Sequence, residues 1–416
     1  MPKFNAAGIV TVVTLCCALV LGACTHNSTS STAVKKSSVP TATVQAPSEN
    51  PELSPKPLTF TIVGTGDVLS HEAVMEASLQ SDGTYDYAPL LDDIKPYIQE
   101  ADLALCHQEV LFAKDNASRS GYPVFRAPPG WASSPKKLGY DGCSLASNHT
   151  WDTGRQGIVD TIAVFSQQGL GTAGANISPD QDPIQYYELH RDHRVIRIAH
   201  LSITYGTNYG DVSELNENPW LIQQKDPNLI VEQARLAREK GGADVVIASV
   251  HHGNEYNPVP SDEQRRWAKI LADSGVVDLY LGHHVHVPQA IERIDGGVDG
   301  QGMYAFFGTG NLLSHHQTRV GVATETGIIA RATLTVPAQG NARVDNVSWI
   351  AIGVDRQTSR VYTTYHYDQS EHPESELSND LAQRYHDYVS EVVGNVAAEW
   401  TQPPGKPAEP ASIIAR

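Results

Sequence analysis

The 416-residue sequence has no run rich in lysine or arginine and no evident internal repeat. Its 30 lysine and arginine residues are outnumbered by 47 aspartate and glutamate residues, so the formal net charge is −17. Because binding to nucleic acid depends on basic side chains that neutralise phosphates, we expect no nucleic-acid partner. The same charge argues against a broad polyanion-binding surface, but it leaves room for a local cationic metal centre.

Cysteine is also scarce, and three of the five cysteines lie near the start of the chain, at Cys16, Cys17 and Cys24. The apolar stretch from about residue 6 to residue 21 is too short to span a bilayer comfortably, which is typical of a signal peptide. It ends in Leu21-Gly22-Ala23-Cys24, which matches the bacterial lipobox. We therefore expect a lipoprotein signal peptide at residues 1–23 and a lipidated Cys24 that anchors an extracytoplasmic protein to the membrane. A plain signal peptide cleaved nearby is the alternative.

The other two cysteines, Cys106 and Cys143, each lie near the end of an apolar, strand-like run. A secreted protein folds in an oxidising compartment, where a disulfide can persist. If the two strands are neighbours, such a bond is geometrically possible. Two separate buried thiols are equally compatible with the sequence.

Composition divides the rest of the chain into four parts. Residues 24–57 are rich in Ser, Thr, Pro and Ala, which predicts a flexible tether. Residues 58–336 alternate strand-like and helix-like segments, which predicts a layered α/β domain with helices packed on a sheet. Residues 337–400 are expected to form an extension packed on this domain, and residues 401–416 are expected to be disordered.

Clusters of polar residues follow the predicted strands of the α/β domain. Because loops at the carboxyl ends of strands are where α/β folds assemble sites, we expect the clusters to converge on one pocket. The clusters are Gly64–Asp67, His107–Glu109, Ser147–Asp152, His251–Glu255, His283–His286 and Thr309–Asn311.

Two of these clusters are dense in histidine, and His284 and His286 project to one side of an emerging strand as a chelating pair. Imidazoles combined with the oxygens of Asp67, Glu109 and Asn148 suit Mn, Zn or Fe, as one or two divalent ions. Such a centre activates a water molecule and stabilises developing negative charge. His149 is placed to donate a proton to a leaving group.

Each of these residues also has a purely structural interpretation. Asp67 could cap a helix, and Asn148 could be a turn residue. Glu109 follows a buried strand, where an unpaired carboxylate would be costly, so a cationic partner is expected. Arg126 could clamp an anionic substrate or form a surface ion pair.

Taken in order, the clusters resemble the CapA family of bacterial capsule proteins, which is associated with poly-γ-glutamate synthesis and is similar in fold to calcineurin-like metallophosphoesterases. The resemblance implies that fold, with a β-sheet core flanked by helices. The sequence departs from the family pattern at Leu69, where a His usually follows the first Asp by two positions, and at His107 and His252. The motifs that carry it are Gly66-Asp67, His107-Gln108-Glu109, Ser147–Asp152, His251–Tyr256, Gly282–Val287 and Gly310-Asn311.

The resemblance also assigns roles to individual residues, with His149 as the catalytic residue. It leaves open whether His283 or His284 binds a metal. The implied metal ligands are Asp67, Glu109, Asn148, His251, His284 and His286. Arg126, Glu255 and Asn311 are assigned to substrate. Asp152, His252 and His283 are expected to orient the ligands.

The implied function is a membrane-anchored, metal-dependent hydrolase of cell-envelope or capsule polymer biosynthesis. Its expected partners are an anionic polymer such as poly-γ-glutamate or a phosphorylated precursor, together with membrane synthase or export components. The alternative is a non-catalytic binding or assembly factor on the same scaffold, which the loss of a ligand at Leu69 favours.

Overall fold

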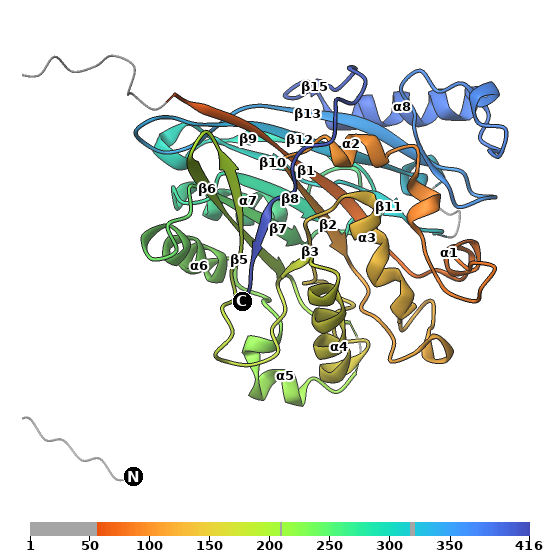
Figure 1. Ribbon diagram of the computed structural model, residues 1–416, viewed down its shortest axis with the longest axis horizontal. Coiled ribbons are helices and arrows are strands. Elements are labelled where there is room, and N and C mark those ends of the chain that lie inside the picture. Colours follow the sequence, from red (N-terminus) through yellow and green to blue (C-terminus); the bar gives the residue numbers. More distant parts are fainter. Residues whose placement is uncertain (1–55, 209, 317–320) are drawn as a thin grey trace, which may run out of the picture. The chain divides into compact units, whose positions relative to one another are not determined.

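The computed structural model describes residues 56–208, 210–316 and 321–416 (Figure 1). The predicted signal peptide, Cys24 and nearly all of the predicted tether lie outside the described residues. Among the described residues, none of the helices combines the length and the apolar character needed to cross a membrane.

Two β-sheets form the centre of the structure. The first has nine strands: β1 (Leu58–Val68), β2 (Leu103–Gln108), β3 (Gly142–Ser144), β4 (Gly171–Ala173), β11 (Asn311–Leu313), β12 (Thr326–Val336), β13 (Arg343–Val354), β14 (Val361–Thr363) and β15 (Ala398–Glu399). The second has seven strands: β5 (Gln185–Arg191), β6 (Arg194–Thr204), β7 (Val245–His251), β8 (Leu279–His283), β9 (Ile291–Ile294), β10 (Met303–Phe306) and β16 (Ser412–Ile414).

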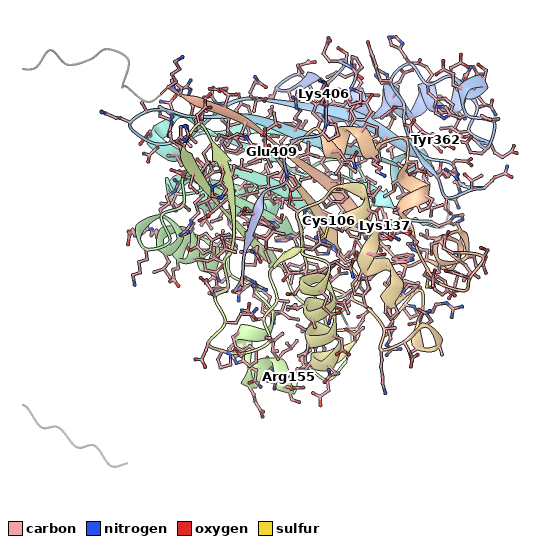
Figure 2. All side chains as sticks on the ribbon, in the orientation of Figure 1. Cys106, Lys137, Arg155, Tyr362, Lys406 and Glu409 are labelled. Atoms are coloured by element: carbon pink, nitrogen blue, oxygen red, sulfur yellow. A yellow bond between two sulfur atoms is a disulfide. The ribbon has the colours of Figure 1, made fainter. Side chains whose placement is uncertain are left out.

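Helices cover the outer faces of the sheets, with one exception. The helices are α1 (Glu72–Ala77), α2 (Lys95–Gln99), α3 (Ser134–Leu138), α4 (Gly154–Gln167), α5 (Ser213–Glu217), α6 (Asn228–Glu239), α7 (Asp262–Asp273) and α8 (Asn379–Val393). The exception is α8, which packs on β13 and adds Val389 and Val393 to the core on the inner face of the first sheet. Residues of α2, α3 and α4 share a core with the outer face of β2 and β3, and residues of α6 and α7 share another with β6 and β7. Figure 2 shows the side chains that fill these layers.

A third core lies between the two sheets, because alternate residues of each strand point to opposite faces. In β7, Val245 and Ile247 face the first sheet, whereas Val246 and Ala248 face the helices. Phe60 of β1 lies in the same core between the sheets. The order helix, sheet, sheet, helix confirms the predicted layered α/β fold.

Parallel strands bring the polar clusters to one edge. Strands β1 to β4 run parallel, as do β6, β7 and β8. In register, Asp67 lies beside both His107 and Asn311, and His251 lies beside His283. The carboxyl ends of both sheets therefore place their polar residues at a common edge.

The carboxyl-terminal part of the chain is more ordered than its composition predicts. β13 pairs with β12 over most of its length, so the region after residue 336 completes the first sheet. The predicted disorder of residues 401–416 is wrong at the end of the chain, where β16 pairs with β5. The Arg416 guanidinium donates to the Asn176 and Thr172 side chains and to the Ala175 carbonyl, which holds this strand in place.

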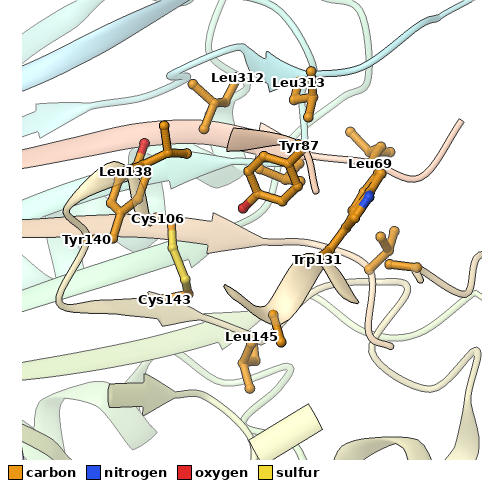
Figure 3. Close-up of a cluster of buried hydrophobic side chains, with 14 of the residues drawn as sticks. Leu69, Tyr87, Cys106, Trp131, Leu138, Tyr140, Cys143, Leu145, Leu312 and Leu313 are labelled. Atoms are coloured by element: carbon orange, nitrogen blue, oxygen red, sulfur yellow. A yellow bond between two sulfur atoms is a disulfide. The ribbon is translucent and has the colours of Figure 1, made fainter. Parts of the chain in front are cut away.

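Cys106 and Cys143 form a disulfide in the core beneath α3 and α4 (Figure 3). They lie directly opposite each other on the neighbouring parallel strands β2 and β3, with Cα atoms 4.4 Å apart. The condition for a bond, that the two strands be neighbours, is therefore met. The bond closes a loop between residues 37 positions apart and fixes the register of a short strand.

The Cys106→Ala/Cys143→Ala double variant is expected to lose about 2–4 kcal/mol of unfolding free energy, because the cross-link restricts the unfolded chain. Urea titration with and without a reductant measures this loss. Reduced wild-type protein should unfold near the midpoint of the double variant, and the double variant should not respond to reductant. Equal midpoints for all four samples would contradict a structural disulfide.

Candidate metal centre

Two glycines allow the first strand to approach its neighbours closely at the site. A Cβ on Gly66 would lie 2.1 Å from the Gly310 carbonyl oxygen, so no other residue fits there without a shift of the backbone. The next residue, Asp67, donates its backbone N–H to the same carbonyl at 3.0 Å. A Cβ on Gly64 would lie 2.7 Å from the Leu281 side chain of the second sheet. The close approach brings Asp67 against the histidine loop that follows β8.

Asp67 is fully buried, and imidazoles surround its carboxylate. Oδ1 lies 3.3 Å from His283 Nδ1 and 4.0 Å from His107 Nε2, and Oδ2 lies 3.1 Å from His286 Nδ1. Oδ2 also accepts the backbone N–H of His284 at 3.2 Å. Burial would raise the pKa of Asp67, but the contacts with His283 and His286 outweigh it and hold the pKa well below its ordinary value. Asp67 is therefore ionised.

Glu109 is the second buried carboxylate, and neither of its oxygens has a hydrogen-bond partner among the described residues. Its Oε1 lies 3.7 Å from His286 Nε2 and 4.0 Å from His251 Nε2. Burial raises the pKa of Glu109 well above its ordinary value, although the charge of His286 opposes the shift. A buried carboxylate without partners is costly, so this position favours a bound cation.

The pKa of His286 also reflects the negative charge of the two carboxylates. Burial would lower its pKa, but Glu109 and Asp67 outweigh burial and raise the pKa to about 9. The imidazoles of His107 and His251 behave in the opposite way, because burial, with neighbouring imidazoles, holds their pKa well below the usual range. The site thus combines ionisable carboxylates with neutral nitrogen donors, which fits a divalent transition-metal ion.

Among the described residues, three groups of side chains have ligand atoms within 4.8 Å of one another. They are Asp67 with His107 and His251, Asp67 with Glu109 and His286, and Glu255 with His284 and His286. Two of the groups share Asp67, and two share His286. This sharing is compatible with one or two ions.

The loop after β8 aims the histidines by adopting an unusual backbone. His284 and His286 have φ angles of 87° and 59°, in the left-handed region that costs a residue other than glycine about 1–3 kcal/mol. Asn311 holds this loop, since its Nδ2 donates to the carbonyls of His286 and Thr324 at 3.0 Å. Its Oδ1 lies 3.1 Å from His286 Nδ1. Asn311 therefore positions a candidate ligand, and its contact with substrate stays a prediction.

The other candidate ligands come together as expected. Asn148 Oδ1 lies 2.7 Å from His251 Nε2. The ring of His284 lies 4.7 Å from that of His251, measured between centroids. The structure thus gathers Asp67, Glu109, Asn148, His251, His284 and His286 in one buried cluster.

His149 lies at the side of this cluster with Asp152. Its Nδ1 lies 2.7 Å from Asp152 Oδ2, which also accepts the backbone N–H of Phe125 at 2.7 Å. The ring of Phe125 meets that of His149 edge-on at 4.9 Å. Asp152 and Phe125 therefore fix the orientation of the His149 ring.

The remaining predicted residues differ in how closely they approach the carboxylates and imidazoles of the cluster. The ring of His252 packs on that of Trp267, with centroids 4.5 Å apart, whereas His283 stacks on His107 and contacts Asp67. Glu255 is exposed. Arg126 makes backbone hydrogen bonds with Ser120, and its side chain forms no ion pair among the described residues, so the alternative of a surface ion pair is not seen there and the clamp stays a prediction.

The sequence interpretation missed two histidines beside the cluster. The ring of His316 lies 4.5 Å from that of His286 and 4.7 Å from that of His71. His71 follows β1, and His316 follows the neighbouring parallel strand β11. The pairing of these strands was not evident, but each histidine follows a recognised polar cluster by four or five positions.

Residues 61–316 match the family of the bacterial capsule synthesis protein PGA_cap. The match covers more than half of the chain, and the chain therefore belongs to this family.

Three relatives of this chain have names that refer to capsule or polymer synthesis. The capsule biosynthesis protein CapA of Bacillus anthracis is 29% identical over 263 residues, which are 62% of this chain and 59% of the relative. The PGA biosynthesis protein CapA of Bacillus subtilis (strain 168) is 31% identical over 180 residues, 43% of either chain. A probable polyglutamine synthesis accessory protein of Mycobacterium tuberculosis is 24% identical over 255 residues, 58% of this chain and 63% of the relative. The chain thus spans only about half the length of the first two relatives.

Two solved structures are similar at low TM-scores. The NAD nucleotidase of Haemophilus influenzae has a TM-score of 0.43 and 10% identity, over 84% of this chain and 58% of its own. The calcineurin-like phosphoesterase YfkN of Bacillus subtilis has a TM-score of 0.42 and 13% identity, over 80% of this chain and 99% of its own.

Gly66→Ala is expected to destabilise the protein by at least about 2 kcal/mol, because the added methyl group overlaps the Gly310 carbonyl. Gly206→Ala is the matched control, since a Cβ there meets no atom within 4 Å. Thermal unfolding of both variants compares the two positions. Equal melting temperatures would show that β1 does not approach β11 as described.

Proposed function

We propose that this protein is a divalent-metal-dependent hydrolase of capsule or cell-envelope polymer biosynthesis. The observation that carries the proposal is the pair of buried carboxylates, Asp67 and Glu109, enclosed by imidazoles and paired with no lysine or arginine among the described residues. One or two ions of Mn, Zn or Fe would offset their charge. Such ions, when bound, lower the pKa of a water molecule and stabilise negative charge that develops on substrate.

The residues around the cluster support hydrolysis. Asp67, Glu109, Asn148, His251, His284 and His286 would hold the ions. His149, oriented by Asp152 at 2.7 Å, would give a proton to the leaving group. Holding the donor in one orientation is what general acid catalysis requires, because proton transfer depends on geometry as well as on pKa.

The substrate is proposed from the family and its relatives. Their descriptions refer to capsule and PGA biosynthesis. We assign this chain an anionic envelope polymer, poly-γ-glutamate in the first instance, or a phosphorylated precursor. With a net charge of −17, the protein would attract such a polymer only locally, at the metal centre. A lipid on Cys24 would place the protein outside the membrane, near synthase or export components.

A non-catalytic binding factor is the second candidate. Leu69 is 1% exposed and packs in the core beneath α1 to α4, so it provides no ligand. A centre with one ligand fewer could bind polymer without cleaving it. The two functions differ in turnover and share the requirement for metal.

Purified full-length protein is expected to retain one or two equivalents of Mn or Zn after reconstitution and dialysis, measured by mass spectrometry. Asp67→Asn and His286→Ala should lose most of this metal, because each removes a buried ligand. Asp141→Asn is the control, since Asp141 is also buried but accepts the backbone N–H of Ala104 elsewhere in the fold. Wild-type protein that holds no divalent ion would rule out the hydrolase.

The His149→Gln variant tests catalysis separately from metal binding. This variant should keep its metal but lose at least about 100-fold in the hydrolysis of an aryl phosphodiester or of poly-γ-glutamate, because a positioned proton donor contributes factors of this size. Asp152→Asn should lose less, since the ring of His149 keeps its contact with Phe125. If wild-type protein binds metal and cleaves neither substrate, the binding factor is the better description.

A further inference from the structure

Two buried imidazoles connect the candidate metal centre to the interior of the first sheet. The Ser144 hydroxyl oxygen lies 2.7 Å from His107 Nδ1, and His107 Nε2 lies 2.9 Å from His251 Nδ1. His251 Nε2 in turn lies 2.7 Å from Asn148 Oδ1. All four residues are fully buried. The three contacts form a continuous chain of hydrogen bonds from β3 to the site.

Without a cation, the chemistry of the groups fixes the direction of this chain. The Asn148 amide oxygen can only accept a hydrogen bond, so His251 carries its proton on Nε2. The bare Nδ1 of His251 then accepts from His107 Nε2–H. The bare Nδ1 of His107 accepts from the Ser144 hydroxyl. Burial, with the neighbouring imidazoles, holds the pKa of both rings well below the usual range.

We propose that His107 is a positioning residue that links cation binding at His251 to a concerted change of tautomer in both rings. The proposal rests on the metal-dependent function proposed above. His251 Nε2 faces Glu109 Oε1 at 4.0 Å and must give up its proton to offer a lone pair there. Its proton then resides on Nδ1 and is donated to His107 Nε2. His107 carries its own proton on Nδ1 and donates it to the Ser144 oxygen.

The proton count balances at every step. Each ring holds one proton before and after the change, and only its position differs. The Ser144 hydroxyl, which no longer donates to His107, turns to the Cys106 carbonyl oxygen at 3.4 Å. A histidine ligand needs an acceptor for its second N–H, and here a second imidazole provides it.

The surroundings keep His107 in its place. Its ring stacks on that of His283, with centroids 4.1 Å apart and an angle of 14° between the planes. The Cys106–Cys143 disulfide lies one residue before the His107–Ser144 pair in the same register. The short strand β3 therefore cannot slide and remove Ser144 from His107.

The first test is nuclear magnetic resonance of wild-type full-length protein labelled with ¹⁵N-histidine, recorded without metal and with one equivalent of Zn²⁺. We expect both rings to carry the proton on Nε2 without metal and on Nδ1 with zinc. Zinc binding with unchanged tautomers would overturn the proposal, and so would a zinc-bound nitrogen on His107. If wild-type protein binds no zinc, the metal-dependent function itself fails, and the tautomer change fails with it.

Zinc affinities of variants test the same link without relying on activity. His107→Leu should weaken zinc binding by about 10–100-fold, because it removes the acceptor for His251 Nδ1–H. His107→Gln, whose amide oxygen can accept this proton, should stay within a few-fold of wild type. His200→Leu is the matched control, since His200 is equally buried but bonds to Ser249. Equal affinities for His107→Leu and wild type would overturn the proposal.

Discussion

The structure depends on the burial of negative charge at the meeting point of two sheets. Asp67 and Glu109 are fully buried, and Glu109 has no hydrogen-bond partner among the described residues. Imidazoles surround them in place of lysine or arginine, and His286, whose pKa the two carboxylates raise to about 9, offsets only part of their charge. Burying these carboxylates lowers the stability of the fold. A bound cation would offset this cost, because it would pair with their negative charge.

The strand order explains how this charge is assembled. Strands β1 and β2 bring Asp67 and His107 side by side, and β7 and β8 bring His251 and His283 side by side. The apolar core between the sheets sets their separation, and glycine at positions 64 and 66 allows the closest approach. Each carboxylate comes from the first sheet and most of the imidazoles come from the second. The site therefore exists only when both sheets have formed.

The sequence predicted the edge of the fold at which the site forms, because polar clusters after apolar strands are a local signal. The predicted ligands Asp67, Asn148 and His251 come together for this reason. Contacts that depend on long-range pairing could not be predicted. His316 reaches the site because β11 pairs with β1, and Asn311 turns toward the histidine loop because Thr324 and His286 expose carbonyls there. The order of the terminal strand β16 likewise depends on a distant edge, that of β5.

Residues that follow the family match also contribute to the candidate metal centre. The match ends at residue 316, yet Arg356, which follows β13, donates to the His316 carbonyl at 2.9 Å and lies 3.0 Å from His315 Nε2. Glu325 pairs with Arg356 at 3.1 Å and accepts from the Tyr385 hydroxyl of α8 at 2.7 Å. These contacts hold the segment that carries His316 against His286. Strands β12 and β13 and helix α8 thus do more than extend the sheet, because they fix one wall of the candidate metal centre.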